Sequence, residues 1–255
     1  MTEPPLMNRV ALVTGAGSGI GRAAALELGK RGAAVAVNYR HSRDGAEQVV
    51  ELLRASGREA EAFACDVTRA DDVAGMVSAV EERFGRIDIL VNNAGDLLER
   101  RTLAEMTEAL FREVFEVNVL STFLCSQAVA NGMTARGSGV IVNMSSLAAH
   151  TGGGPGAFAY AGAKAAIIAM SKALAKELAP RGVRVNCVSP GLIGDTRFHS
   201  RFTPAETYSA VARSVPIGRG GTPEEVATVI AFLAGDDAAY LTGETIEING
   251  GLLMR

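Results

Sequence analysis

The stretch "TGAGSGIGRAAALEL" at residues 14–28 gives the strongest local indication of the fold. It follows "RVALVT" at 9–14, an apolar run typical of a buried strand, and it leads into an alanine-rich helical segment. Glycine permits a tight turn and a close approach to a ligand, and the helix start offers free N–H groups to a pyrophosphate. A glycine-rich turn at the first strand–helix junction therefore predicts a dinucleotide or nucleotide site. No Gly-Lys-Ser/Thr closes this loop, which excludes a P-loop.

Short β-branched runs alternate with longer helical patterns along the rest of the chain. Six further strand-like runs, nearly all apolar, lie at 33–38, 61–66, 87–92, 139–144, 183–188 and 244–249. Helical patterns lie near 19–31, 43–56, 70–84, 107–135, 159–179 and 223–234. This alternation predicts an α/β fold: a doubly wound, Rossmann-like parallel sheet of about seven strands with helices on both faces.

No linker or repeat divides the sequence, so we expect one domain over residues 1–255. The least regular stretch, 192–215, follows a strand end and is long for a connection. It is a candidate lid over the site.

Composition excludes several classes of protein. The 255 residues are 48% hydrophobic and 21% charged, with a net charge of −3, which argues against nucleic acid or an anionic membrane as the main partner. The three cysteines and three histidines show no spacing of a disulfide framework or a metal site. The N-terminus does not resemble a signal or transit peptide, and no run of about 18 apolar residues occurs. These features predict a cytoplasmic protein with no metal site.

Two helical segments carry apolar residues on nearly every face: 159–179 and the second half of 107–135. A helix that covers a sheet needs only one apolar stripe, so a second apolar face predicts another burial partner. A second subunit is the favoured partner, and an alanine-rich surface helix is the alternative.

One helical stretch, "AYAGAKAA" at 159–166, places Tyr160 and Lys164 four positions apart. Residues i and i+4 share a helix face, and a neighbouring ammonium lowers the pKa of a phenol from its usual value of about 10. The pair therefore predicts an acid/base for a carbonyl or hydroxyl oxygen. The alternative is a core tyrosine and a surface lysine that share a helix by coincidence.

A set of motifs identifies a family resemblance that covers essentially the whole chain. The sequence resembles the classical short-chain dehydrogenase/reductase family in "TGAGSGIG" (14–21), "CDV" (65–67), "NNAG" (92–95), "NMSS" (143–146), "YAGAK" (160–164), "SPG" (189–191) and "NGG" (249–251). The motifs follow the family's order with near-family spacing. The resemblance implies an NAD(P)(H)-dependent oxidoreductase that interconverts a ketone and a secondary alcohol.

The resemblance also implies catalytic roles. Tyr160 would donate the proton in reduction, and Lys164 would lower its pKa and hydrogen-bond the nicotinamide ribose. Ser146 would hold the substrate oxygen, with Ser145 as the competing serine, and Asn118 would anchor a proton-relay water. Neither serine sits in the GxSxG elbow of a serine hydrolase.

By the same resemblance, cofactor contacts are expected at Gly15, Ser18, Gly19, Ile20, Gly21, Arg40, Asp66, Val67, Asn93, Ala94, Gly95, Tyr160, Lys164, Pro190, Gly191 and Ile193. Asn92 would lie on the ribose side. Many relatives have a threonine two residues after the isoleucine of that motif, whereas Thr196 follows Ile193 by three, which leaves its role open.

The end of the second strand bears on the choice between NADP(H) and NAD(H). An acidic residue there would hydrogen-bond the adenosine ribose and repel a 2′-phosphate, but this chain has "NYRHS" at 38–42. Arg40 offers a charged fork to a phosphate, while position 18, basic in many NADP-preferring relatives, is serine. The sequence therefore predicts NADP(H), with NAD(H) as the less favoured cofactor.

Within the family, the chain is most similar to 3-oxoacyl-[acyl-carrier-protein] reductases, which implies an acyl-thioester substrate and a homotetramer. Sugar, steroid or other small-alcohol dehydrogenases are the alternatives. A non-catalytic dinucleotide-sensing protein is an alternative of another class, which retention of both Tyr160 and Lys164 disfavours. A methyltransferase would leave Ser146, Tyr160 and Lys164 unexplained.

Overall fold

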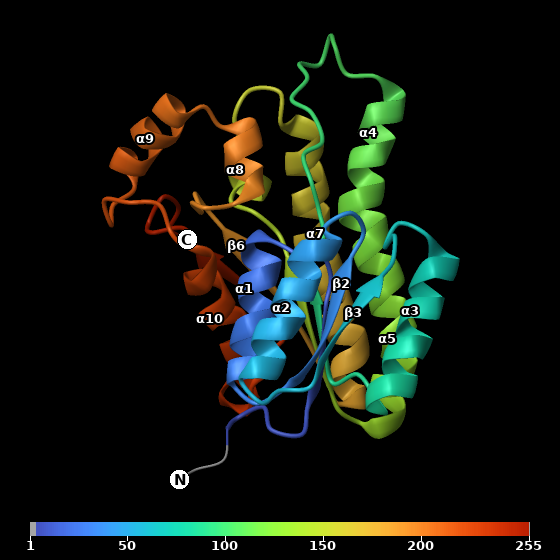
Figure 1. The fold of residues 1–255 in the computed structure, drawn as a ribbon. Coiled ribbons are helices and arrows are strands. Elements are labelled where there is room, and N and C mark those ends of the chain that lie inside the picture. The colour runs from blue at the N-terminus through green and yellow to red at the C-terminus, as the bar shows by residue number, and fades with distance from the viewer. Residues whose placement is uncertain (1–3, 255) are drawn as a thin grey trace.

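The computed structural model describes residues 4–254 and places seven parallel strands in one sheet (Figure 1). Their order is β3-β2-β1-β4-β5-β6-β7, so the direction of winding reverses between β1 and β4. The strands are β1 Val10–Val13, β2 Ala34–Tyr39, β3 Ala60–Ala64, β4 Ile89–Asn92, β5 Gly139–Met144, β6 Val183–Pro190 and β7 Thr245–Ile248. Every neighbouring pair is parallel. The predicted doubly wound sheet is confirmed.

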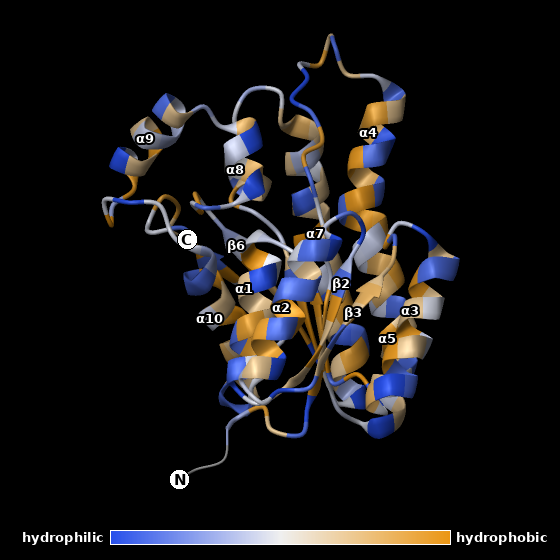
Figure 2. Ribbon diagram, viewed as in Figure 1, coloured by the Kyte–Doolittle hydropathy of each residue, from blue (hydrophilic) through white to orange (hydrophobic). Residues whose placement is uncertain are grey.

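Helices cover both faces of the sheet (Figure 1). One core packs against α1 (Gly19–Lys30), α2 (Arg43–Ala55) and α10 (Pro223–Ala234). The other packs against α3 (Ala70–Phe84), α5 (Ser121–Arg136) and α7 (Phe158–Leu178). Figure 2 shows the apolar residues concentrated in the strands and on the helix sides that face them, which is why the strands read as continuous apolar runs.

Sequence patterns place most elements within two residues, and local signals explain some of the boundaries. Thr222 caps α10 by accepting a hydrogen bond from the backbone N–H of Glu225, whose side chain accepts from the Thr222 N–H in return. Pro223 occupies the first turn, where its missing N–H costs nothing. Such a capping box makes the start of a helix readable from sequence.

The helix expected over 107–135 is not continuous. The structure has α4 (Glu108–Phe115), a π turn (Glu116–Leu120) and then α5. Asn118 lies in the π turn, where its Nδ2 donates to the Val114 carbonyl at 2.8 Å, and the Thr122 hydroxyl donates to the Asn118 carbonyl at 2.9 Å. Side chains that bond carbonyls one turn back compete with the regular ladder, and π turns are frequent at functional sites.

The irregular stretch 192–215 contains two short helices, α8 (Arg197–Phe202) and α9 (Ala205–Ser214). A further short helix, α6 (Ala148–Thr151), lies between β5 and α7. Sequence patterns did not predict these three elements, because their few turns bury too little apolar surface to leave a clear periodicity.

One helix, Phe158–Arg181, is long and apolar enough to cross a membrane by length and composition. It contains α7, whose Ala175 and Leu178 pack in the core against the sheet. Burial against the sheet accounts for the apolar composition of the helix face that carries them.

Candidate active site

A cavity of about 1030 Å³ opens at the carboxyl edge of the sheet, beside the reversal of winding between β1 and β4. Residues that follow β1, β2, β4, β5 and β6 line it, together with α7 and the 192–215 segment. Parallel strands of a doubly wound sheet bind ligands at this point, because the loops leaving the two halves diverge there.

The glycine-rich loop is held in place by two buried polar side chains, Asn38 from β2 and Thr14 at the start of the loop itself. The Asn38 Oδ1, at the end of β2, accepts a hydrogen bond from the Gly15 N–H at 3.1 Å. The Thr14 Oγ1 accepts from the backbone N–H groups of Asn93 and Ala94, both at 3.0 Å. These bonds fix the loop after β1 against the loop after β4. Sequence reasoning used Asn38 only as a non-acidic residue and missed Thr14, although a polar residue ending an apolar strand is a readable signal.

Most of the predicted cofactor contacts line the cavity. These are Gly15, Ser18, Gly19, Ile20, Arg40, Asn93, Ala94, Gly95, Tyr160, Lys164, Pro190, Gly191 and Ile193. Gly21, Asp66 and Val67 lie outside its lining. A Cβ at Gly21 would stand 2.4 Å from the Asn93 Nδ2, so this glycine allows loop packing rather than ligand approach. Asn92 also lies outside the lining, where its amide bonds Asn143 at 2.8 Å and Ser126 at 3.0 Å inside the core.

Asp66 does not line the cavity itself, but it forms an ion pair with Arg40, which does. Its Oδ2 lies 3.1 Å from the Nε of Arg40, and Thr68 donates to its Oδ1 from both its hydroxyl and its backbone N–H. Burial opposes ionisation of Asp66, but the Thr68 hydrogen bonds and the Arg40 charge outweigh it and hold the pKa of the carboxyl below its usual value. Because the ion pair uses Nε, both Nη groups of Arg40 remain available to a phosphate.

The structure separates the two competing serines. The Ser145 hydroxyl donates to the Lys164 carbonyl at 2.8 Å, inside the core. The Ser146 hydroxyl accepts from the Ala148 N–H at 3.2 Å and lies close enough to the phenol of Tyr160 to lower its pKa. Both Ser146 and Tyr160 line the cavity, so two hydroxyls converge on one point there.

Lys164 is buried, at 3% exposure, and its Nζ donates to the Met144 carbonyl at 2.9 Å. The ammonium lies 5.6 Å from the centroid of the Tyr160 ring. Gly95 makes room for it, because a Cβ at that position would come within 3.0 Å of the Lys164 Nζ. Burial lowers the pKa of the ammonium from 10.5 to about 8.

The direction of the Tyr160 pKa differs from the sequence-based expectation. Burial raises the pKa of Tyr160 to about 12, the hydrogen bond from Ser146 lowers it in part, and the Asp96 carboxylate raises it further. Desolvation penalises the phenolate more than the neighbouring lysine favours it. In this buried environment the phenol therefore keeps its proton at neutral pH, as a proton donor requires.

Asn118 is fully buried behind the cavity. Its Nδ2 donates to the Asp96 carbonyl at 2.7 Å, as well as to Val114. Its Oδ1 has no hydrogen-bond partner within the described part of the chain, and it would lie 2.5 Å from a Cβ placed at Gly95. A buried acceptor beside Lys164 is a place for a bound water.

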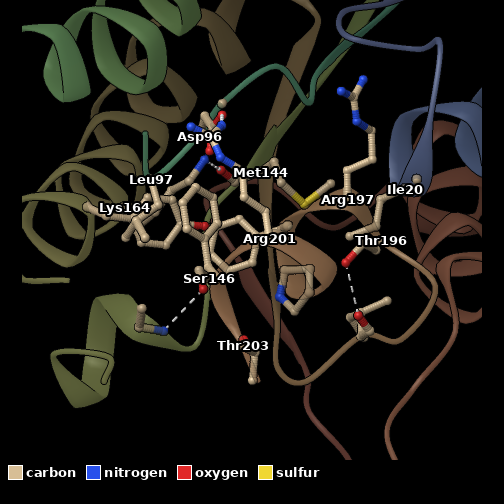
Figure 3. Close-up of a pocket in the computed structure, with 18 of the residues that line it drawn as sticks. Ile20, Asp96, Leu97, Met144, Ser146, Lys164, Thr196, Arg197, Arg201 and Thr203 are labelled. Atoms are coloured by element: carbon tan, nitrogen blue, oxygen red, sulfur yellow. Dashed lines mark hydrogen bonds and ion pairs between the residues drawn. The ribbon is translucent and has the colours of Figure 1, made fainter. Parts of the chain in front are cut away.

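The 192–215 segment covers the paired hydroxyls. The Phe198 ring packs on the Tyr160 ring with centroids 5.4 Å apart. Arg201 bonds the Asp96 carboxylate at 3.2 Å and the Leu98 carbonyl at 2.9 Å, and Figure 3 shows it extending toward Asp96. The Arg100 Nε donates to the Phe202 carbonyl at 3.1 Å. These bonds join the segment to the loop that follows β4.

Thr196 lies beside the glycine-rich loop despite its shifted spacing. Asp195 takes a left-handed φ of 51°, which turns the chain so that Thr196 follows close to the loop. The Thr196 hydroxyl donates to the Ile193 carbonyl at 3.2 Å, and a Cβ built at Gly19 would lie 3.8 Å from its methyl group. Thr196 therefore lies in the cavity wall, and a contact between it and the cofactor stays a prediction.

The residues present fit a nicotinamide dinucleotide. Gly19 takes a φ of +54°, which glycine adopts without strain, and its missing side chain leaves space between the loop and Thr196. Ser18 makes no side-chain capping bond, so the first N–H groups of α1 can bind an anion. The Lys164 ammonium sits at the far end of the same cavity.

Comparison with known proteins gives a consistent result. A family model described as enoyl-(acyl carrier protein) reductase matches residues 15–253. An uncharacterized oxidoreductase of Methylorubrum extorquens is 44% identical over 248 residues, covering 97% of this chain and 98% of the relative. The 3-oxoacyl-[acyl-carrier-protein] reductase of Staphylococcus epidermidis is 40% identical over 97% of this chain and 100% of its own length. That of Synechocystis is 42% identical over 98% of both chains.

The matches extend over nearly the whole chain, and the motifs that carry the resemblance surround the cavity. The chain belongs to the short-chain dehydrogenase/reductase family and is an oxidoreductase that acts on a ketone and alcohol pair with a nicotinamide dinucleotide.

Proposed function

We propose that the protein reduces the ketone of a 3-oxoacyl thioester to a secondary alcohol, with NADPH as the hydride source. The observation that carries the proposal is the convergence of the Ser146 and Tyr160 hydroxyls inside the cavity, next to a buried Lys164. Two hydroxyls aimed at one point suit a carbonyl oxygen that gains a proton.

Each residue has a role in this reaction. When bound, the nicotinamide supplies the hydride to the ketone carbon. Ser146 donates a hydrogen bond that holds the ketone oxygen, and Tyr160 transfers its phenolic proton to that oxygen. The Lys164 ammonium stabilises the resulting phenolate. The Asn118 Oδ1 accepts a hydrogen bond from a water that returns a proton toward Lys164.

Two observations support an acyl-thioester substrate over a sugar or steroid alcohol. The relatives named above as 3-oxoacyl-[acyl-carrier-protein] reductases match along 98–100% of their length. The cavity lining includes the apolar side chains Leu97, Leu147, Phe198, Phe202 and Val211, which suit an acyl chain. A sugar would leave its hydroxyls facing these groups without partners.

A cofactor-oxidation screen tests the substrate proposal. It compares acetoacetyl and longer 3-oxoacyl thioesters with a 2-enoyl thioester, a diketone, a sugar and a quinone, at equal concentration. We expect the 3-oxoacyl thioesters to give the highest kcat/KM. A higher value for the enoyl thioester would show that the site reduces C=C bonds, and a higher value for a sugar or a quinone would overturn the substrate class.

Arg40 supports the choice of NADPH. It lines the adenosine end of the cavity, 53% exposed, with both Nη groups free of the Asp66 contact. We expect Arg40→Ala to lower the NADPH/NADH ratio of kcat/KM by about tenfold or more, the value of one charge-assisted hydrogen bond. Arg43→Ala, which removes an exposed arginine paired with Glu47, is the matched control and should leave the ratio unchanged. A wild type that favours NADH would overturn the cofactor assignment.

An apolar surface supports a homotetramer. Phe111, Leu120 and Phe123 are 37–42% exposed along α4, the π turn and α5, where Figure 2 shows orange bands among the polar ones. The Phe111 and Phe115 rings stack at 4.9 Å, and the groove beside them reaches Met170 on α7. These are the two segments that the sequence singled out, and a second copy would bury them.

Light scattering at micromolar concentration tests the assembly. We expect a tetramer for the wild type and a smaller species for Phe123→Arg, because a guanidinium at the centre of an apolar contact is costly to bury. Leu52→Arg, an exposed leucine on α2, is the control and should remain tetrameric. An active wild-type monomer would contradict the proposal.

We also propose that the protein works in the cytoplasm. Cys65, Cys125 and Cys187 are all buried, free thiols, which suits a reducing compartment.

A further inference from the structure

The 192–215 segment contacts the adenosine end of the cavity as well as Tyr160. The Nη1 of Arg197 donates to the Ser42 hydroxyl at 3.2 Å, joining α8 to the residue that precedes α2. In Figure 3 the Arg197 side chain starts near Thr196 and extends away from Ser146 and Lys164. Arg197 therefore faces the end of the cavity where Arg40 and Ser42 lie, rather than the substrate end.

The formal charges at the adenosine end of the cavity show why the position of Arg197 matters. Arg40 lines the adenosine end, but its ion pair with Asp66 cancels its charge, leaving a formal net charge of zero. Arg197 forms no ion pair among the side chains that the structure describes, so it brings that end to +1. A phosphate monoester carries about −1.5 to −2 at neutral pH and needs such a surplus.

Ser42 completes the arrangement. Its hydroxyl oxygen accepts from Arg197, and its proton makes no hydrogen bond within the described part of the chain, so the hydroxyl can donate to an anion. The serine at position 18 leaves the glycine-rich loop without a basic side chain. A guanidinium from α8 can supply the second cation from the opposite wall.

We propose that Arg197 binds the 2′-phosphate of NADPH opposite Arg40, and so makes the 192–215 segment part of the cofactor-specificity site. This inference rests on the proposed NADPH preference. Phe198, the next residue, packs on Tyr160, so a phosphate that holds Arg197 also holds the aromatic cover over the proton donor. Cofactor choice and closure of the segment are thereby coupled.

Calorimetry with fragments of the cofactor tests the proposal without turnover. Adenosine 2′,5′-bisphosphate and 5′-AMP differ only in the 2′-phosphate. We expect the wild type to bind the bisphosphate more tightly, and Arg197→Ala to weaken the bisphosphate by about tenfold while AMP affinity stays within twofold. Arg197→Lys should recover part of the loss, because a lysine keeps the charge without the fork. Arg213→Ala, an exposed arginine on α9, is the matched control.

The outcomes separate this inference from the proposed function. If the wild type does not distinguish the two ligands, both the NADPH preference and the role of Arg197 are wrong. If the wild type prefers the bisphosphate and Arg40→Ala removes the preference but Arg197→Ala does not, only the role of Arg197 is wrong. An equal loss for both ligands would assign Arg197 to closing the segment alone.

Hydrogen–deuterium exchange provides a second readout. In the wild type, adenosine 2′,5′-bisphosphate should slow amide exchange in α8 more than 5′-AMP does at equal saturation. This difference should vanish in Arg197→Ala, whose thermal melting should match that of the wild type, since the side chain is exposed. A difference that persists in the variant would overturn the coupling.

Discussion

Tyr160→Phe should lower kcat for ketone reduction by about 10²–10⁴-fold, the usual contribution of a positioned general acid. The ring that packs on Phe198 stays, and only the hydroxyl that meets Ser146 is lost. Dinucleotide affinity should therefore remain within a few-fold of the wild type. Steady-state kinetics and a fluorescence titration of the reduced cofactor measure the two quantities separately.

Tyr240→Phe is the control for this variant, because it makes the same chemical change at a fully exposed position. It should leave both quantities unchanged. A Tyr160→Phe variant with near-normal kcat would remove the phenol from the mechanism. A loss confined to KM would make Tyr160 a residue that binds substrate without transferring a proton.

Lys164→Met should lower kcat by about 100-fold or more and weaken dinucleotide binding as well, since the ammonium lies 5.6 Å from the centroid of the Tyr160 ring and Lys164 lines the same cavity. Lys172→Met, on an exposed position of the same helix, should change neither quantity. A loss of activity with unchanged dinucleotide affinity would show that Lys164 acts only on the Tyr160 phenol and does not bind the dinucleotide.

The same variant should also change how stability depends on pH. The pKa of Lys164 is about 8 in the folded protein and 10.5 in the unfolded chain, so between these values the unfolded state binds more protons. The free energy of unfolding of the wild type should therefore rise relative to Lys164→Met by about 2–3 kcal/mol from pH 7.5 to pH 10. Denaturant unfolding at both pH values measures this difference. Lys172→Met is the control, and its free energy of unfolding should differ from that of the wild type by the same amount at both pH values.

Local patterns determined the fold and pointed to the residues proposed to react. Strands buried on both faces must be apolar throughout, and helices on a sheet must repeat every 3.6 residues, so the order of elements is visible in the chain. Tyr160 and Lys164 are neighbours on one helix, so their proximity follows from a separation of four residues. The glycine-rich loop is likewise a local feature of one strand–helix junction.

Tertiary structure decided what depends on distant segments. Ser145 and Ser146 are adjacent in the sequence, and only the approach of α7 to the end of β5 assigns one to the Lys164 carbonyl and the other to the Tyr160 phenol. The Asn118 side chain in the π turn also bonds the Asp96 carbonyl, 22 residues away in the sequence. Spacing alone carries no information on such contacts.

The pKa of Tyr160 and the position of the Arg197 side chain both depend on residues that are distant in the sequence. Spacing on α7 predicted a lowered pKa, but desolvation by the elements around the phenol raises it, and desolvation is a sum over all neighbours. Arg197 meets Ser42 across 155 residues of sequence, because the chain from β6 folds back over the glycine-rich loop. Sequence thus determined the arrangement of residues that lie within a few positions of one another, whereas three-dimensional packing decided which distant residues line the same cavity.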